Sequence, residues 1–286
     1  MPFSNVLNQG YNGFIMEKPI SVIMSVYDED EQYLRASIES ILHQSLADFE
    51  FIIINDGSRS SAIQEVLTQY AAEDSRIRVY TNETNLGLTQ SLNKALGLTT
   101  GKYIARLDSD DLAHPDRLKK QFEFMEAHPD HVLCGSFASL INENSKKTSE
   151  KKSPTEYRVI KKKLLFYNFF THSSFFFQRT TVQALGNYNT EIKKAQDYDL
   201  VLKLSAKYPV AILPEFLCLH RIHGQSISAR SKKKQERYAL LARWNAIAHY
   251  GYPKTHFWKI LPALFYFLFI PHFLEEKIWK LIHQYT

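Results

Sequence analysis

Cysteine is scarce in this chain of 286 residues, which contains only Cys134 and Cys218. The two lie far apart and have no metal-ligand spacing, so we expect reduced thiols in a cytosolic fold. Residues 1–18 mix polar and aromatic side chains and lack the apolar core of a signal peptide. These absences favour a protein that folds in a reducing compartment.

The chain also lacks a hydrophobic run long enough to span a bilayer. The uncharged run Ile260–Leu274 contains two prolines and one histidine and falls short of the roughly 20 apolar residues required. Trp258, Lys259, Trp279 and Lys280 flank it, as interfacial anchors do. We expect this tail to contact a membrane surface, although a buried C-terminal helix would need the same composition.

Positive charge is unevenly spread within a net charge of +5. Each cluster alone is typical of a solvated face, but together Lys146–Lys152, Lys161–Lys163 and Arg230–Arg237 suit an anionic partner. No helix-turn-helix, zinc or RNA-binding signature accompanies them, so we expect no nucleic acid. With the aromatic tail, an anionic membrane surface is the better expectation.

The first half of the chain alternates strand and helix patterns. Repeated β-α units with short connections predict an α/β fold with a mostly parallel sheet and helices on both faces. Strands are expected over 20–26, 49–54, 77–80, 103–107 and 132–137, and helices over 33–43, 62–72, 88–96 and 115–128.

The second half is less regular. An aromatic segment, 168–177, follows an expected helix over 157–167. Further helices are expected over 197–206 and 231–250, and short strands over 209–213 and 218–222.

Three aspartates end the strand in YIARLDSDD, Tyr103–Asp111. Carboxylates this close disfavour one another's ionisation, and a cation removes that repulsion. Asp108 and Asp110 are two residues apart in an extended segment, so their side chains point the same way. Capping of the helix near Pro115 could explain one aspartate but not three. The cluster therefore predicts an Mg²⁺ or Mn²⁺ site that binds a diphosphate.

Other polar residues have both a functional and a structural interpretation. Asp56, after the second strand, can accept a hydrogen bond from a ligand such as uracil, but Asp-Gly is also a common turn. Asp197 is either a general base or a helix N-cap, and Asp199 competes with it for the first role. His223 either ligates a metal or contacts a phosphate, although solitary histidines are more often structural.

The order and spacing of five segments resemble the family-2 inverting glycosyltransferases over about residues 18–228. The segments are ISVIMSVYDEDEQYLRASIESILHQSLADFEFIIINDGS, NLGLTQSLNKAL, GKYIARLDSDDLAHPDRL, HSSFFFQRTTVQALGNYNTEIKKAQDYDLVLKL and RIHGQSIS. The resemblance implies a GT-A fold, with a Rossmann-like nucleotide half (about 18–135) and an acceptor half (about 136–228) on one sheet. Residues 229–286 then form a helical, membrane-associating region.

The resemblance also implies roles for individual residues. Nucleotide binding falls to Ser25, Tyr27 (packed on the base), Asp28, Asp56 (on uracil), Asn85 and Asp108 (near the ribose). Asp110, with Asp108 and His223, is implied to bind Mn²⁺ or Mg²⁺. Asp197 is implied to be the catalytic base, and His172 is implied to contact the acceptor. The family often has Pro-Thr-Tyr-Asn where this chain has Ser25–Asp28, and two aspartates where it has Asn55–Asp56.

The implied activity is metal-dependent, inverting transfer of a hexose or N-acetylhexosamine from a UDP-sugar to a lipid-linked saccharide. Bacterial surface polysaccharide (capsule, O-antigen or lipopolysaccharide) is the expected product. The chain has no array of transmembrane helices and no Gln-x-x-Arg-Trp segment after Asp197, which favours one sugar per acceptor. We expect a cytoplasmic enzyme, peripheral on the inner face of the cell membrane.

Two other functions compete with this interpretation. A non-catalytic nucleotide-sugar-binding subunit would dock on a membrane polysaccharide assembly, but the intact acidic motifs argue against a decayed site. A nucleotidyltransferase would need a glycine-rich, basic loop after the first strand, where this chain has the acidic SVYDEDE.

Overall fold

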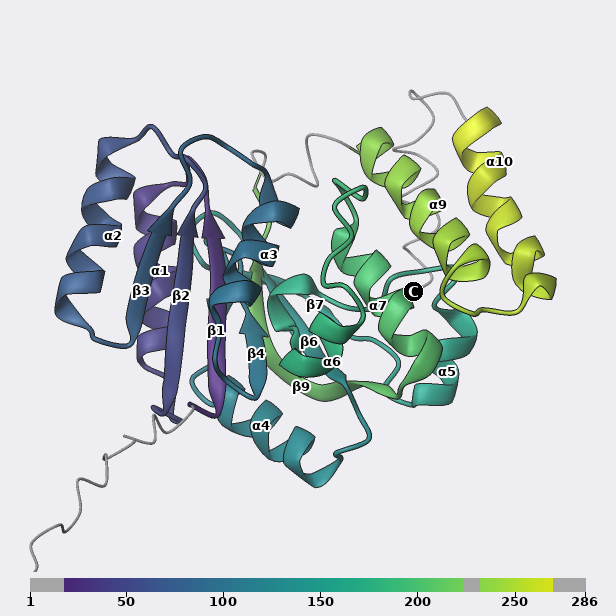
Figure 1. Ribbon diagram of the computed structural model, residues 1–286, viewed down its shortest axis with the longest axis horizontal. Helices are drawn as coiled ribbons and strands as arrows, with labels where there is room; N and C mark the ends of the chain where they lie inside the picture. The colour runs from purple at the N-terminus through teal and green to yellow at the C-terminus, as the bar shows by residue number, and fades with distance from the viewer. Residues whose placement is uncertain (1–17, 224–231, 270–286) are drawn as a thin grey trace, which may run out of the picture.

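A single nine-stranded sheet runs through the computed structural model, which describes residues 18–223 and 232–269 (Figure 1). Its strands are β1 (Ile20–Val26), β2 (Phe49–Asn55), β3 (Ile77–Thr81), β4 (Tyr103–Arg106), β5 (Leu112–Ala113), β6 (Leu133–Ile141), β7 (Lys147–Lys151), β8 (Phe176–Gln178) and β9 (Val210–Arg221).

The strand order separates a parallel part from a mixed part. The order is β3-β2-β1-β4-β8-β6-β9-β5, and β7 pairs with β6. Strands β1 to β4 pair in parallel, with Ile20 beside both Phe49 and Tyr103. Strand β8 is antiparallel to both β4 and β6, so it joins the two parts. The expected α/β fold with parallel first strands is confirmed, and the later strands are mixed.

Helices cover both faces of this sheet. They are α1 (Glu31–Leu42), α2 (Ser61–Glu73), α3 (Leu88–Leu98), α4 (Arg117–Ala127), α5 (Tyr157–Lys163), α6 (Arg179–Ala184), α7 (Gln196–Lys207), α9 (Lys232–Ala248) and α10 (Leu261–Phe269), with short 3-10 turns η1 (His172–Ser174) and η2 (Lys254–Ile260). In Figure 1, α1 and α2 lie beside β1 to β3, and α9 and α10 lie at the opposite side of the molecule.

Alternation along the central strands produces two separate cores. Phe51 and Ile53 of β2 pack with residues of α1, α2 and α4 on one face. Ile52 and Ile54 pack with residues of α3, α5, α7 and α9 on the other. Successive side chains of a strand point to opposite faces, so a strand buried on both faces reads as the unbroken apolar run seen here.

The C-terminal strand differs from the sequence-based prediction. Two short strands were expected on either side of Pro214, but β9 is continuous through it. The register with β6 shifts near Ser136 and Phe137, which is the irregularity that accommodates the proline. Strands β5, β7 and β8 were not expected.

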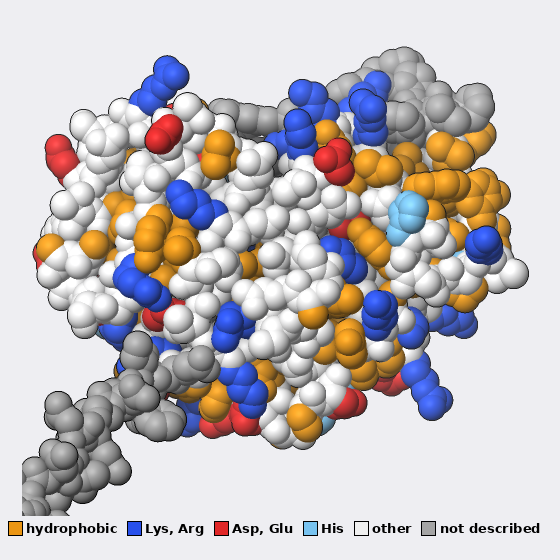
Figure 2. Space-filling view, in the orientation of Figure 1, with side chains coloured by type: hydrophobic (Ala, Val, Ile, Leu, Met, Phe, Trp, Pro, Cys, Tyr) orange, Lys and Arg blue, Asp and Glu red, His pale blue; other side chains and the backbone are white. Residues whose placement is uncertain are grey.

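The aromatic tail is partly packed and partly exposed. Lys259 and Ile260 are buried, whereas Trp258 and Phe265 are 57% and 60% exposed. The rest of the run to Leu274 lies outside the described residues. Figure 2 shows hydrophobic side chains gathered at the side of the molecule where α10 lies. Among the helices described, none has the length and apolar character that a membrane span requires.

Candidate active site

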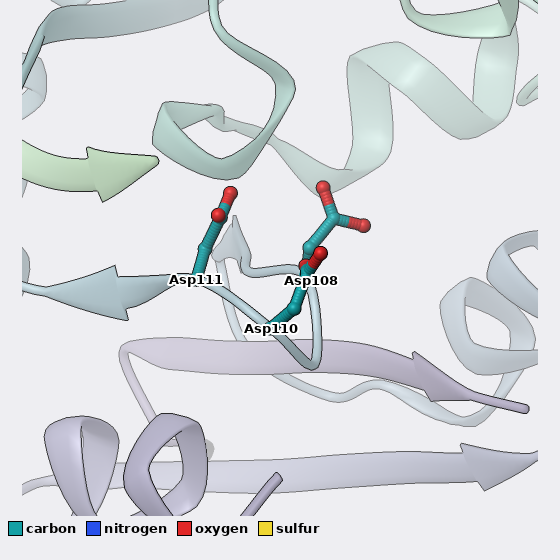
Figure 3. A group of neighbouring side chains, drawn as sticks. All are labelled: Asp108, Asp110 and Asp111. Carbon is teal, nitrogen blue, oxygen red and sulfur yellow. The ribbon is translucent and has the colours of Figure 1, made fainter. Parts of the chain in front are cut away.

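Three carboxylates from the turn between β4 and β5 form the centre of the candidate site (Figure 3). Oxygen atoms of Asp108, Asp110 and Asp111 all lie within 4.8 Å of one another. The turn follows the carboxyl end of β4, which is the edge where open α/β sheets bind ligands. Each carboxylate has a different partner, and these partners define different roles.

Asp108 is paired with a buried arginine. Both terminal nitrogens of the Arg106 guanidinium donate to its two carboxylate oxygens, and Ser173 Oγ donates to Oδ2 at 2.9 Å. Burial opposes ionisation of Asp108, but the Arg106 charge outweighs it and holds the pKa of Asp108 below its usual value. Asp108 is therefore a fixed, neutralised carboxylate.

Asp111 is fully buried and belongs to the scaffold. It accepts hydrogen bonds from the Arg221 backbone N–H at 2.7 Å and from His220 Nδ1 at 3.0 Å. Burial opposes protonation of His220, but Asp111 outweighs it and keeps the pKa of His220 above its usual value. Asp111 thus ties the turn to the end of β9.

Within residues 18–223 and 232–269, the Asp110 carboxylate has no arginine or lysine partner for its charge. Its Oδ2 lies 2.9 Å from His223 Nε2. Burial, followed by the charges of Asp111 and Asp108, raises the pKa of Asp110 to about 7. A divalent cation would remove this penalty, and carboxylate oxygens with an imidazole nitrogen form a donor set that fits one. Of the three carboxylates, Asp110 is thus the one whose charge the described residues compensate least, and it is the one suited to bind a metal.

Asp56 anchors the loop that immediately precedes α3. Its Oδ1 accepts from Asn82 Nδ2 at 2.8 Å and from the Leu86 N–H at 2.9 Å, and its Oδ2 accepts from the Gly87 N–H at 2.9 Å. A carboxylate oxygen accepts about two hydrogen bonds, so Oδ2 keeps capacity for one ligand donor. Asp56 therefore shapes the nucleotide edge whether or not it also contacts a base.

Glycine is required directly after Asp56. Gly57 has φ +73°, and a Cβ there would lie 2.6 Å from the carbonyl carbon of Thr84. The turn after β2 can therefore pack against the loop that carries Asn85, which is exposed at this edge.

The loop after β1 is tied to the same edge. Asp28 has φ 44° and accepts hydrogen bonds from Ser58 Oγ at 2.7 Å and from the Arg59 N–H at 3.2 Å. Aspartate tolerates this left-handed backbone better than most residues. Ser25 is half-buried at the end of β1, and Tyr27 is 47% exposed. The loops that carry Ser25 to Asp28, Asp56 and Asn85 thus meet at one edge of the sheet.

Asp197 and Asp199 separate into two environments on α7. Asp197 is half-buried, and its Oδ2 accepts from Asn168 Nδ2 at 3.0 Å. Burial raises the pKa of Asp197, and the Tyr198 backbone and the charge of Arg106 oppose this only in part. Asp199 is fully buried, and both of its oxygens accept from Tyr250 Oη at 2.9 Å. Asp199 fixes α7 to the segment after α9 and is not available as a base.

His172 was predicted from the sequence as an acceptor contact, whereas several residues around it were not predicted. Tyr188 Oη lies 2.9 Å from His172 Nε2, and Ser173 contacts Asp108. The sequence does contain a signal for Arg106. It is a charged residue inside an apolar strand, and because it lies two residues before Asp108, the two side chains point to the same face. Ser173 and Tyr188 gave no such signal, since only the folded chain brings them to the site.

The sequence matches the family described as "Glycosyl transferase family 2" over residues 21–184. The chain belongs to this family of glycosyltransferase enzymes.

Two curated relatives are 37% identical to the chain. One is an uncharacterized glycosyltransferase of Methanocaldococcus jannaschii, and the match covers 89% of this chain and 90% of the relative. The other is the O-antigen biosynthesis glycosyltransferase WbnJ of Escherichia coli, with 72% of this chain and 81% of the relative covered.

Solved structures show the same fold at lower identity. S. aureus TarS 1-349 in complex with UDP-GlcNAc has a TM-score of 0.69 at 16% identity, covering 90% of this chain and 77% of TarS. The mannosyltransferase PcManGT of Pyrobaculum calidifontis, in complex with GDP-Man and Mn²⁺, has a TM-score of 0.65 at 17% identity, covering 88% and 70%. The expected GT-A glycosyltransferase fold is confirmed.

The raised pKa of Asp110 predicts a pH-dependent stability of the metal-free protein. The folded state keeps a proton that the unfolded state releases near pH 3.8, so stability should fall as pH rises from about 4 to about 7. Asp110→Asn removes this cost and should stabilise the metal-free protein by roughly 2–4 kcal/mol at pH 8. It should also abolish stabilisation by Mn²⁺.

Urea unfolding from pH 4 to pH 8, with and without Mn²⁺, measures both effects. Asp48→Asn is a suitable control, because the Asp48 side chain is 61% exposed. An Asp110→Asn protein that Mn²⁺ stabilises as much as the wild type would remove Asp110 from the metal site.

Proposed function

We propose that the protein transfers a hexose or N-acetylhexosamine from a UDP-sugar to a saccharide acceptor with inversion, adding one sugar per acceptor in surface-polysaccharide assembly. The supporting observation is the contrast between Asp110, suited to a cation, and Asp197, a separate carboxylate whose pKa is raised by burial. The relative WbnJ, an O-antigen biosynthesis enzyme, supports the product class.

The nucleotide of the donor would lie against the edge formed by the loops after β1, β2 and β3. Tyr27 offers an exposed ring for a base, Asp56 keeps one acceptor site, and Asn85 lies beside them. The complex of TarS with UDP-GlcNAc supports a uridine nucleotide. Asp108, held by Arg106, would contact the ribose.

A divalent ion, Mn²⁺ or Mg²⁺, would be held by Asp110 with His223, while Asp108 lies beside it and stays paired with Arg106. Such an ion stabilises the negative charge that grows on a leaving diphosphate. The Mn²⁺ in the PcManGT complex supports a divalent ion in a protein of this fold.

Asp197 would act as the general base. Asn168 Nδ2 orients the carboxylate by donating to its Oδ2, and the carboxylate would accept the proton of an acceptor hydroxyl. The deprotonated oxygen would attack the anomeric carbon opposite the diphosphate, forming the new glycosidic bond as the old C–O bond breaks. A carboxylate with a raised pKa is a stronger base than an exposed aspartate, provided that it is ionised at the working pH.

Replacing the base tests this mechanism. Asp197→Asn should lower transfer by about 10²–10⁴-fold, because the amide cannot accept the proton. UDP-sugar and Mn²⁺ affinities should change little, since Asp197 is separate from the β4–β5 turn.

UDP release in the presence of an acceptor extract measures transfer, and calorimetry measures binding. Asp199→Asn is the matched control on the same helix and should retain transfer. Wild-type transfer by Asp197→Asn would refute the assignment of the base.

We also propose that the acceptor is lipid-linked and that the protein contacts an anionic membrane surface. Trp244, Phe257, Trp258 and Leu261 are each between 42% and 57% exposed around α9, η2 and the start of α10. Lysines lie along the same elements, including exposed Lys254. Exposed aromatic side chains among cations suit the interface of an anionic bilayer (Figure 2).

Vesicle sedimentation tests the membrane contact. Trp244→Ser combined with Trp258→Ser should weaken binding to vesicles of anionic lipid by about tenfold or more, because two interfacial rings are lost. Leu86→Ser is the control, because Leu86 is an apolar side chain that is 44% exposed but lies just before α3, outside the proposed membrane surface. Equal binding by the double variant and the wild type would contradict this surface.

A further inference from the structure

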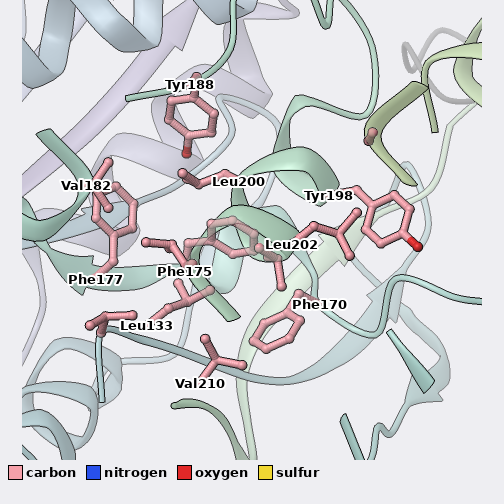
Figure 4. Packing of buried hydrophobic residues seen from close by; sticks show 14 of the residues in the cluster. Leu133, Phe170, Phe175, Phe177, Val182, Tyr188, Tyr198, Leu200, Leu202 and Val210 are labelled. Carbon is pink, nitrogen blue, oxygen red and sulfur yellow. The ribbon is translucent and has the colours of Figure 1, made fainter. Parts of the chain in front are cut away.

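Tyr188 lies behind His172 with a buried hydroxyl group. The Tyr188 side chain is 1% exposed and lies at the edge of the hydrophobic cluster that contains Phe175 and Leu200 (Figure 4). Its Oη is 2.9 Å from His172 Nε2, and the two ring centroids are 5.6 Å apart. Among the described residues, the Tyr188 hydroxyl forms a hydrogen bond with His172 and with no other residue.

This contact determines which ring nitrogen of His172 carries the proton. Burial raises the pKa of Tyr188 well above its usual value, so the phenol keeps its proton. A buried hydroxyl must donate that proton or lose a hydrogen bond, and His172 Nε2 is the acceptor within reach. A neutral imidazole has one donor and one acceptor nitrogen, so an accepting Nε2 leaves the proton on Nδ1.

The surroundings also keep His172 neutral. Burial, followed by the charge of Arg106, lowers the pKa of His172, and the opposing charge of Asp108 is too weak to reverse this. His172 Nδ1 has no hydrogen bond in residues 18–223 and 232–269, yet it is absent from their buried unpaired atoms. Its N–H is therefore a donor that faces accessible space close to Asp108.

The backbone of Tyr188 is clamped from the other half of the fold. The Asn93 side chain on α3 accepts from the Tyr188 N–H at 3.0 Å and donates to the Tyr188 C=O at 2.9 Å. One residue earlier, the Asn187 C=O accepts from Lys203 Nζ at 2.6 Å. The loop that carries Tyr188 is thus fixed before any ligand binds, which reduces the cost of ordering His172 on binding.

We propose that Tyr188 is a positioning residue that fixes His172 in its neutral, Nδ1-protonated tautomer, and that the Nδ1–H donates to a hydroxyl oxygen of the bound saccharide. The part that concerns the saccharide rests on the proposed function, whereas the tautomer does not. The tautomer can therefore be tested in the absence of any transfer.

The ¹⁵N NMR spectrum of the histidine rings in the full chain tests the tautomer. The wild-type protein should show His172, assigned from the signal lost in His172→Asn, with its proton on Nδ1. In Tyr188→Phe the phenolic donor is missing, so the Nε2-protonated form should appear. Tyr252→Phe, which removes a buried hydroxyl paired with Ser205 Oγ at 2.6 Å, should leave His172 unchanged. A wild-type His172 protonated on Nε2 would overturn the proposal even if Tyr188→Phe did not fold.

Transfer kinetics test the use of the Nδ1–H. Asparagine places its amide NH₂ near the position of Nδ1 and glutamine places it near Nε2, so His172→Asn should retain more activity than His172→Gln. Tyr188→Phe should lower kcat/KM for the acceptor roughly tenfold, the effect of one misplaced hydrogen bond, relative to Tyr252→Phe. Equal kcat/KM for Tyr188→Phe and Tyr252→Phe would overturn the positioning role.

If no variant and no wild-type protein transfers sugar, the proposed function fails. The NMR result would then decide the tautomer on its own.

Discussion

Electrostatic repulsion among three carboxylates on one turn is the constraint on which this site depends. Their oxygens lie within 4.8 Å of one another, so the fold must supply compensation. Arg106 neutralises Asp108, and the Arg221 backbone with His220 binds Asp111. Asp110 is left with a neighbouring histidine and a pKa raised to about 7. Two internal compensations thus create one position where a cation is needed.

Much of this compensation comes from distant parts of the chain. Ser173 belongs to η1, and His220 and Arg221 belong to the end of β9, yet all three contact the turn after β4. Strand β8 pairs with β4 on one side and with β6 on the other, and β6 pairs with β9. The continuous sheet therefore brings residues from the second half of the chain to the turn that carries the three aspartates.

The parallel β-α units could be predicted because their strands are apolar on both faces and their helices are amphipathic. The roles of Asp108, Asp110 and Asp197 could be proposed from spacing and resemblance. The internal bonds of Asp56 could not, because Asn82 and Gly87 reach it only through tertiary packing. Likewise, two short strands were expected over 209–213 and 218–222, whereas the irregular pairing with β6 that lets β9 continue through Pro214 depends on tertiary structure.

The central claim is that Asp110 is the carboxylate reserved for the cation while Asp108 stays paired with Arg106. The most direct test is anomalous diffraction from a crystal of the protein soaked with Mn²⁺ and UDP. The account predicts one manganese peak at the carboxylate of Asp110, with the Arg106–Asp108 pair intact. A peak at Asp197 or Asp111, or bound UDP with no manganese at the β4–β5 turn, would contradict it.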